Sequence, residues 1–203
     1  MKQILILVGV LVLFVMYGGC KYNDIVPTDQ NVNAKWANVQ SEYQRRNDLI
    51  PNIVEAVKGE ANFEKSVLEG VINARASATK MTVNASDLTP EKLKQFQDAQ
   101  GQIGSAIGRL LSVSEQYPNL KSNAAFQELR VELEGTENRI KVARNDYNAS
   151  VQSYDVQVKS FPTNMFAGMF GFKDKPYFQA DAGADKSPSI KGAFDNMGGG
   201  TPK

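Results

Sequence analysis

The chain has 203 residues, with 23 basic and 22 acidic side chains, a formal net charge of +1 and no histidine. Its balanced charge lacks the basic surface of nucleic-acid-binding proteins, so we expect no nucleic acid among its partners. Without histidine it lacks the commonest general base and metal ligand, and its single cysteine, Cys20, excludes internal disulfides and cysteine-based metal sites. We therefore expect a protein that is not an enzyme, with no catalytic residues, no cofactor and no metal.

An uncharged, almost wholly apolar run occupies residues 4–20, directly after Gln3. Such a run predicts that the protein is membrane-attached or exported, and two interpretations of it remain open. The small residues before Cys20 are typical of a lipoprotein signal that ends in a lipid-modified cysteine. The run is also near the lower length limit of a transmembrane anchor, in which Tyr17 and Tyr22 would lie at the interface. Tyr17 favours the anchor, because lipoprotein signals usually carry an aliphatic residue there.

Three regions follow from this pattern. Residues 1–26 are the anchor or lipoprotein signal, residues 27–178 form the folded domain, and residues 179–203, rich in Gly, Asp, Ser and Pro, form a flexible tail. The positive charge of Lys2 before the apolar run places the N-terminus inside the cell. We expect a location at the cell membrane, single-pass or lipid-anchored, with the bulk of the chain outside the cytoplasm.

Apolar residues at helical spacing predict three long helices after the anchor. The first spans residues 28–79 with a bend at Pro51, the second spans 89–116 and begins at Thr89-Pro90, and the third spans 123–160. The short connection between the second and third makes them antiparallel. The expected fold is all-α, an elongated antiparallel bundle with coiled-coil-like spacing, preceded by the N-terminal membrane anchor.

Arg46 is the most informative charged residue, because it falls on the apolar stripe of the first predicted helix. A charge in that position needs a partner, and Glu137 in the third helix is the leading candidate. Arg130 and Arg144 lie one heptad from Glu137 on either side. We expect a structural ion pair between Arg46 and Glu137; a solvated residue at the rim of the stripe and a ligand site are the alternatives.

Two further patterns have ordinary structural interpretations. Glu134, Glu137 and Asp146 lie on one predicted helix without a nucleophile or histidine, which is typical of a charged helix face rather than of acid–base catalysis. Gly101, Gly104 and Gly108 interrupt another predicted helix. Glycine within a helix predicts that another helix packs closely there or, alternatively, a surface for self-association.

An apolar segment at residues 165–172 follows the last predicted helix. It contains Phe166, Met169, Phe170 and Phe172, which are too many large apolar side chains for an indifferent linker. We expect it to fold back over the end of the bundle, to enter the membrane interface or to receive a partner protein.

Several blocks of the sequence, in order and over residues 1–178, together resemble the LemA family of bacterial membrane-anchored proteins. They are Lys21-Tyr22-Asn23, Arg45-Arg46-Asn47-Asp48-Leu49-Ile50-Pro51-Asn52, Glu134-Gly135-Thr136-Glu137-Asn138-Arg139-Ile140, Asp146-Tyr147-Asn148, Phe161-Pro162-Thr163-Asn164, Gly168-Met169-Phe170-Gly171-Phe172 and Tyr177-Phe178. The resemblance implies a short extracytoplasmic or anchoring N-terminus, an elongated helical bundle and a membrane-associated protein of no established enzymatic activity.

Two functions are compatible with these features. The first is a non-enzymatic, membrane-anchored envelope protein whose bundle serves protein interaction or scaffolding. The alternative is an accessory subunit of a membrane enzyme or transporter complex, whose activity resides in another chain. The expected partners are the membrane and either an unidentified protein or a second copy of this chain.

Overall fold

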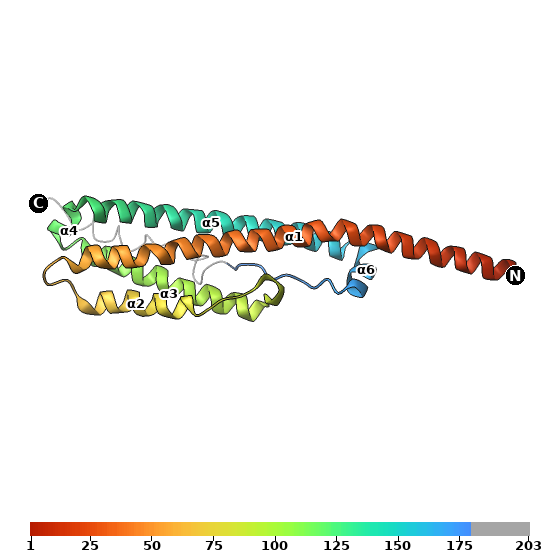
Figure 1. The fold of residues 1–203 in the computed structure, drawn as a ribbon, viewed down its shortest axis with the longest axis horizontal. Helices are drawn as coiled ribbons and strands as arrows, with labels where there is room; N and C mark the ends of the chain where they lie inside the picture. Colours follow the sequence, from red (N-terminus) through yellow and green to blue (C-terminus); the bar gives the residue numbers. More distant parts are fainter. Residues whose placement is uncertain (180–203) are drawn as a thin grey trace, which may run out of the picture.

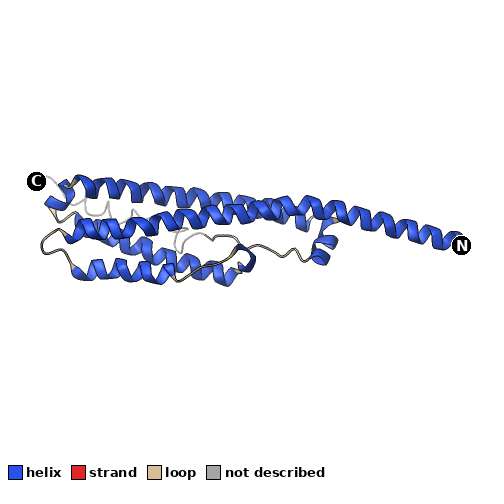
Figure 2. Ribbon diagram, viewed as in Figure 1, coloured by secondary structure: helices blue, strands red, loops and turns tan. Residues whose placement is uncertain are grey.

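The computed structural model describes residues 1–179, so all of the predicted tail but Gln179 lies outside the described residues. Helices make up most of the described part, which contains no strand (Figure 2). The all-α prediction is therefore confirmed. In chain order the helices are α1 (Lys2–Lys58), α2 (Lys65–Thr79), the 3₁₀ turn η1 (Ala85–Asp87), α3 (Pro90–Ser114), α4 (Pro118–Ser122), α5 (Ala124–Lys159) and α6 (Thr163–Phe170).

The helices form an elongated bundle whose neighbours in the chain run in opposite directions (Figure 1). α1 extends along the whole rod and α5 returns beside it, while α2 and α3 form a second antiparallel pair. The N-terminal part of α1 projects beyond the other long helices, and the short α6 lies against it. The predicted elongated, antiparallel bundle is confirmed.

The prediction that the first helix begins at residue 28 is wrong, because α1 begins at Lys2 and passes through Pro27 without a break. Proline has no backbone N–H to donate within the helix, and two backbone carbonyls near Pro27 accept hydrogen bonds from side chains. The Thr28 hydroxyl donates to the carbonyl of Ile25 at 2.7 Å, and Gln157 Nε2 donates to that of Asp24 at 2.6 Å. Among the described residues, no helix combines the length and the apolar character needed to cross a membrane.

The predicted helix 28–79 is also wrong in part, since the structure divides it into α1 and α2. α1 continues past Pro51, as expected, but ends at Lys58 with Gly59 as its cap. Asn62 then takes a left-handed backbone conformation at φ 68°, which asparagine tolerates better than most residues, and the chain reverses. α2 also buries an apolar face, through Val67 and Val71. The helical spacing of apolar residues therefore continues across the α1–α2 turn, and the turn could not be detected from that spacing.

The other two long helices lie within two residues of their predicted bounds, because each begins at a residue whose side chain caps it. Thr89 accepts a hydrogen bond from the backbone N–H of Lys92 at 3.3 Å. Asn123 Oδ1 accepts one from the N–H of Phe126 at 3.1 Å. Both caps satisfy amides that the first helical turn leaves without partners.

Two apolar cores follow one another along the rod. The core nearer α6 is rich in aromatic rings, with Trp36 packed edge-on against Phe96 and Tyr147. The other core, toward the α1–α2 turn, is mainly aliphatic and includes Ile53 and Ile103. A layer of polar residues separates them.

After α6 the chain runs back along α5 as an extended strap, residues 172–179. The Tyr154 hydroxyl donates to the carbonyl of Lys173 and the Tyr147 hydroxyl to that of Pro176, each at 2.9 Å. Asn148 pairs with both backbone groups of Phe178. The ring of Phe178 completes the aromatic core by stacking on Trp36.

We predict that these buried tyrosines make the fold sensitive to alkali. Burial first, and then the nearby carboxylates of Asp29, Asp155 and Asp174, raise the pKa of Tyr154 to about 12. Because the folded state holds the proton more tightly than the unfolded chain, this stabilisation is complete below about pH 10 and is lost as the pH rises toward about 12. Urea unfolding across this range measures the loss, and Tyr154→Phe should flatten the profile. If the free energy of unfolding of Tyr154→Phe falls as steeply with pH, the loss of stability comes from other groups.

Candidate functional site

The guanidinium of Arg46 lies at the centre of the polar layer between the two cores, and the side chain is only 3% exposed. Nη1 donates to Glu137 Oε1 at 2.7 Å. Nη2 donates to Gln100 twice, to its backbone carbonyl at 2.8 Å and to Oε1 at 2.7 Å. The guanidinium carbon also lies 5.0 Å from the ring centroid of Tyr43. The structure thus brings Arg46 and Glu137 together and joins α1, α3 and α5 through one charge.

The two ends of this ion pair differ in exposure. Arg46 is enclosed, whereas the side chain of Glu137 is 49% exposed and reaches solvent at the edge of the layer. Arg46 Nε is buried and has no hydrogen-bond partner within residues 1–179. A guanidinium in this setting depends on its few acceptors, because the loss of one would leave a buried charge without compensation.

The residues one heptad from Glu137 disfavour other registers. Arg130 and Arg144 lie seven residues before and after Glu137 on α5. If α5 slipped by one heptad along α1, about 10 Å, an arginine would replace the carboxylate opposite Arg46. Two guanidinium groups would then face each other at the edge of the core, which is unfavourable.

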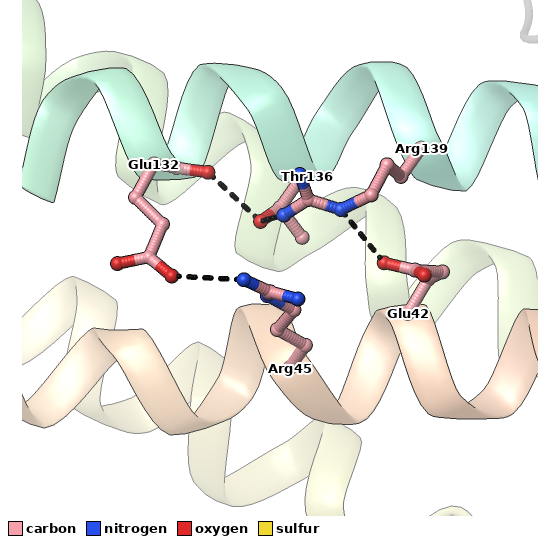
Figure 3. Close-up of polar contacts among 5 residues, drawn as sticks. All are labelled: Glu42, Arg45, Glu132, Thr136 and Arg139. Carbon is pink, nitrogen blue, oxygen red and sulfur yellow. Dashed lines mark hydrogen bonds and ion pairs between the residues drawn. The ribbon is translucent and has the colours of Figure 1, made fainter.

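A second set of polar contacts joins α1 to α5 on the outer side of their seam (Figure 3). Arg45 pairs with Glu132 at 3.2 Å, and Glu42 pairs with Arg139 at 3.1 Å. Thr136 lies between them, accepting from Arg139 at 2.7 Å and donating to the Glu132 carbonyl at 2.8 Å. These pairs place opposite charges across the same antiparallel register that the buried Arg46 requires.

The carboxylates of the predicted charged face all lie in ion pairs. Glu134 pairs with Arg130 at 3.0 Å within α5, and Asp146 pairs with Lys35 of α1 at 2.9 Å. Glu137 is the partner of Arg46. Among the described residues, no three or more His, Cys, Asp or Glu side chains gather as potential metal ligands.

An open groove of about 940 Å³ adjoins the Arg46 layer, and we call it the α3 groove. α3 forms its floor, α2 one wall, and side chains of α1 and α5 the other. Its polar lining combines amides and hydroxyls with four charged side chains, Arg46, Asp98, Glu137 and Arg144. The lining contributed by α2 and α3 includes Asn73, Ser77, Gln97, Gln100, Gln102 and Ser105.

The glycines of α3 do not mark close helix packing, so that prediction is wrong. A methyl group added at Gly101 or Gly108 would meet no atom within 4 Å, and one at Gly104 would come no closer than 3.8 Å to Arg46 Nη1. Gly101 and Gly104 instead line the α3 groove. Because Gly101 and Gly104 have no side chains, they leave space in the groove beside the guanidinium of Arg46.

The predicted membrane or partner residues divide between two surfaces. Phe166 is 3% exposed and packs inward against α1, whereas Met169 is largely exposed on the other side of α6. Phe170 and Phe172 both contact the ring of Tyr22. Cys20 lies on α1 at the same end of the rod, as a free and exposed thiol.

Gln100 is the member of the layer that the sequence interpretation missed. It is buried and supplies two of the three acceptors of Arg46. Its position gave a usable signal, since it lies between Phe96 and Ile103 on the apolar stripe of α3. A polar residue at such a position calls for a buried partner, as it does for Arg46.

Comparison with known proteins gives a consistent family. The LemA family model matches residues 35–191, which is more than half of the chain and agrees with the resemblance seen in the sequence blocks.

Individual relatives are more distant. Magnetosome protein MamQ 2 of Paramagnetospirillum magneticum is 28% identical, over 81% of this chain and 67% of its own length. Magnetosome protein MamQ of Magnetospirillum gryphiswaldense is 28% identical, over 90% of this chain and 74% of its own. Protein LemA of Metamycoplasma hominis is 24% identical, over 83% and 73% respectively.

We predict an asymmetric response when the ion pair is broken. Glu137→Leu leaves the enclosed guanidinium without its counter-charge and should lower the free energy of unfolding by about 3 kcal/mol. Arg46→Met removes the buried charge and leaves a carboxylate that water can reach, so it should cost less, about 1–2 kcal/mol. The double variant should be clearly more stable than the sum of the single changes implies. Urea unfolding measures all three, and strict additivity would contradict the coupling.

Proposed function

Because the chain belongs to the LemA family, we propose that it is a non-enzymatic protein of the cell envelope, attached to a membrane by the start of α1, whose helical bundle binds another protein. None of the names of the three relatives is that of an enzyme. The carboxylates of Glu134, Glu137 and Asp146, the candidates for acid–base chemistry, are engaged in ion pairs with basic side chains. Both facts support a binding role.

The main support for membrane attachment is the exposure of large apolar side chains at the start of α1. Ile4, Leu5, Ile6 and Leu7 are each about two-thirds exposed, as are Leu13 and Met16 further along. Water-facing helices rarely carry so many such side chains without a charge. A lipid environment would cover them at no cost to the bundle, which lies beyond them on the same helix.

Two modes of attachment fit this segment. In one, lipid is joined to Cys20, which is exposed and therefore accessible to an enzyme. In the other, the uncharged segment itself inserts into the bilayer, with Tyr17 and Tyr22 near the interface. In both, the positive charge of Lys2 favours an N-terminus inside and a bundle outside the cytoplasm.

The α3 groove supports protein binding by the bundle. Its amide side chains both donate and accept hydrogen bonds, which matches the alternating donors and acceptors of a polypeptide backbone. The low floor at Gly101 and Gly104 gives a chain segment room to approach the helix. If the partner is a membrane enzyme or transporter, the protein acts as its accessory subunit; native mass measurement after mild detergent extraction would reveal such a partner in fixed stoichiometry.

We predict that charge in the exposed apolar segment abolishes attachment. The double variant Leu5→Asp/Leu13→Asp should stay at the bottom of a flotation gradient with phospholipid vesicles, whereas the unmodified chain floats. Val131→Asp/Val142→Asp is the matched control, because these exposed valines of α5 lie in the bundle. Flotation of the Leu5/Leu13 variant like the control would overturn the attachment proposal.

We predict that Cys20→Ala distinguishes the two modes. If lipid is joined to the cysteine, the unmodified protein should begin at Cys20 and carry acyl chains, whereas this variant should lack the acyl mass and keep residues 1–19, since the cysteine is needed for both lipid attachment and cleavage. If the segment inserts by itself, its intact mass should fall only by the difference between the two side chains and it should stay in the membrane fraction. Intact mass spectrometry of membrane-extracted protein reads out both outcomes.

A further inference from the structure

The two longest uncharged stretches of the sequence, residues 3–20 and 160–172, meet at one end of the rod. They are separated by the whole bundle domain in the chain, yet α6 lies directly against α1 (Figure 1). Lys159 and Lys173 flank the second stretch, just as Lys2 and Lys21 flank the first.

The inner face of α6 fixes its position on α1. Phe166 lies over Gly18 so closely that a methyl group added there would stand 3.0 Å from the ring, and a larger residue would push α6 away. The Tyr17 ring lies 5.8 Å from that of Phe166, and the Tyr22 ring 5.2 Å from that of Phe170. α6 therefore sits at the level of residues 17–22, directly after the exposed apolar start of α1.

The outer side of this segment is apolar as well. Met165 and Met169, one helical turn apart, are 54% and 72% exposed, and Phe161, before the helix, is 81% exposed. A water-facing helix normally places charged or polar side chains opposite its packed face. α6 carries no charge at all and presents large apolar groups on both sides.

We propose that α6 is an interfacial helix that lies in the surface of the bilayer beside the start of α1, with Phe161, Met165 and Met169 among the lipid headgroups and upper acyl chains. The bilayer is the fitting occupant because α6 packs on α1 next to Tyr17 and Gly18, directly after the exposed apolar side chains at the start of α1. Of the two lysines at its borders, Lys159 is held by Asp155 and Asp174, at 2.8 and 3.3 Å, so Lys173 is the one that suits an anionic lipid surface. The inference rests on the proposed membrane attachment and adds a second contact, which would hold the rod at a fixed depth and tilt.

Tryptophan substitutions in the full chain test the contact. Met169→Trp probes the outer face of α6, and Val131→Trp is the matched control on an exposed site of α5. The native Trp36 is buried, so it gives a constant background. Each protein is reconstituted into phosphatidylethanolamine–phosphatidylglycerol vesicles, with or without lipids brominated near the headgroup end of the acyl chains.

For Met169→Trp we expect emission shifted to the blue on reconstitution and reduced by about half by the brominated lipids, as for interfacial aromatic residues, and no change for the control. If the protein floats with the vesicles but the emission shift and bromine quenching of Met169→Trp equal those of the control, the inference is overturned and the attachment proposal stands. A blue shift without bromine quenching would also overturn it, because it would show that protein covers α6. Loss of flotation by the unmodified chain would instead refute the proposed attachment.

Discussion

The packing of this bundle depends on one buried cation. Apolar side chains alone allow long helices to slide past one another, because leucine packs nearly as well one turn further along. The buried guanidinium of Arg46 does not allow this sliding, because it needs hydrogen-bond acceptors in a place that water does not reach. Glu137 and Gln100 supply them from two other helices, so α1, α3 and α5 share one fixed point at the boundary of the aromatic and aliphatic cores.

That fixed point also shapes the surface. The polar layer is open to solvent at Glu137 and along the α3 groove. Glycines of α3 in the groove leave space there, because they carry no side chain. The rod consequently has distinct regions along its length: an apolar end formed by α6 and the start of α1, an aromatic core braced by the C-terminal strap, the Arg46 layer with its groove, and an aliphatic far end. A protein with this layout can attach at one end and offer a polar groove part-way along its length.

Much of the fold could be predicted from the sequence, because α3 and α5 carry both apolar periodicity and capping residues, Thr89 and Asn123. The turn after Lys58 could not, since α2 repeats the same periodicity and only Gly59 and Asn62 mark the reversal. The predicted start at residue 28 fails because α1 continues through Pro27, where Thr28 itself and Gln157 of α5 donate to the carbonyls of Ile25 and Asp24. The need of Arg46 for an acidic partner was predictable from its place on the apolar stripe, whereas the groove was not, because glycine in a helix indicates close packing as readily as open space.

The claim that Arg46 fixes the register of α1 against α5 is tested most directly by a distance measurement. Spin labels at cysteines introduced for Ala37 on α1 and Val131 on α5, with Cys20→Ser, report the register by double electron–electron resonance. This protein should give one narrow distance distribution and, when Arg46→Met is added, a second population displaced by one heptad, roughly 10 Å along the axis. A narrow, unchanged distribution in the Arg46→Met variant would contradict the claim.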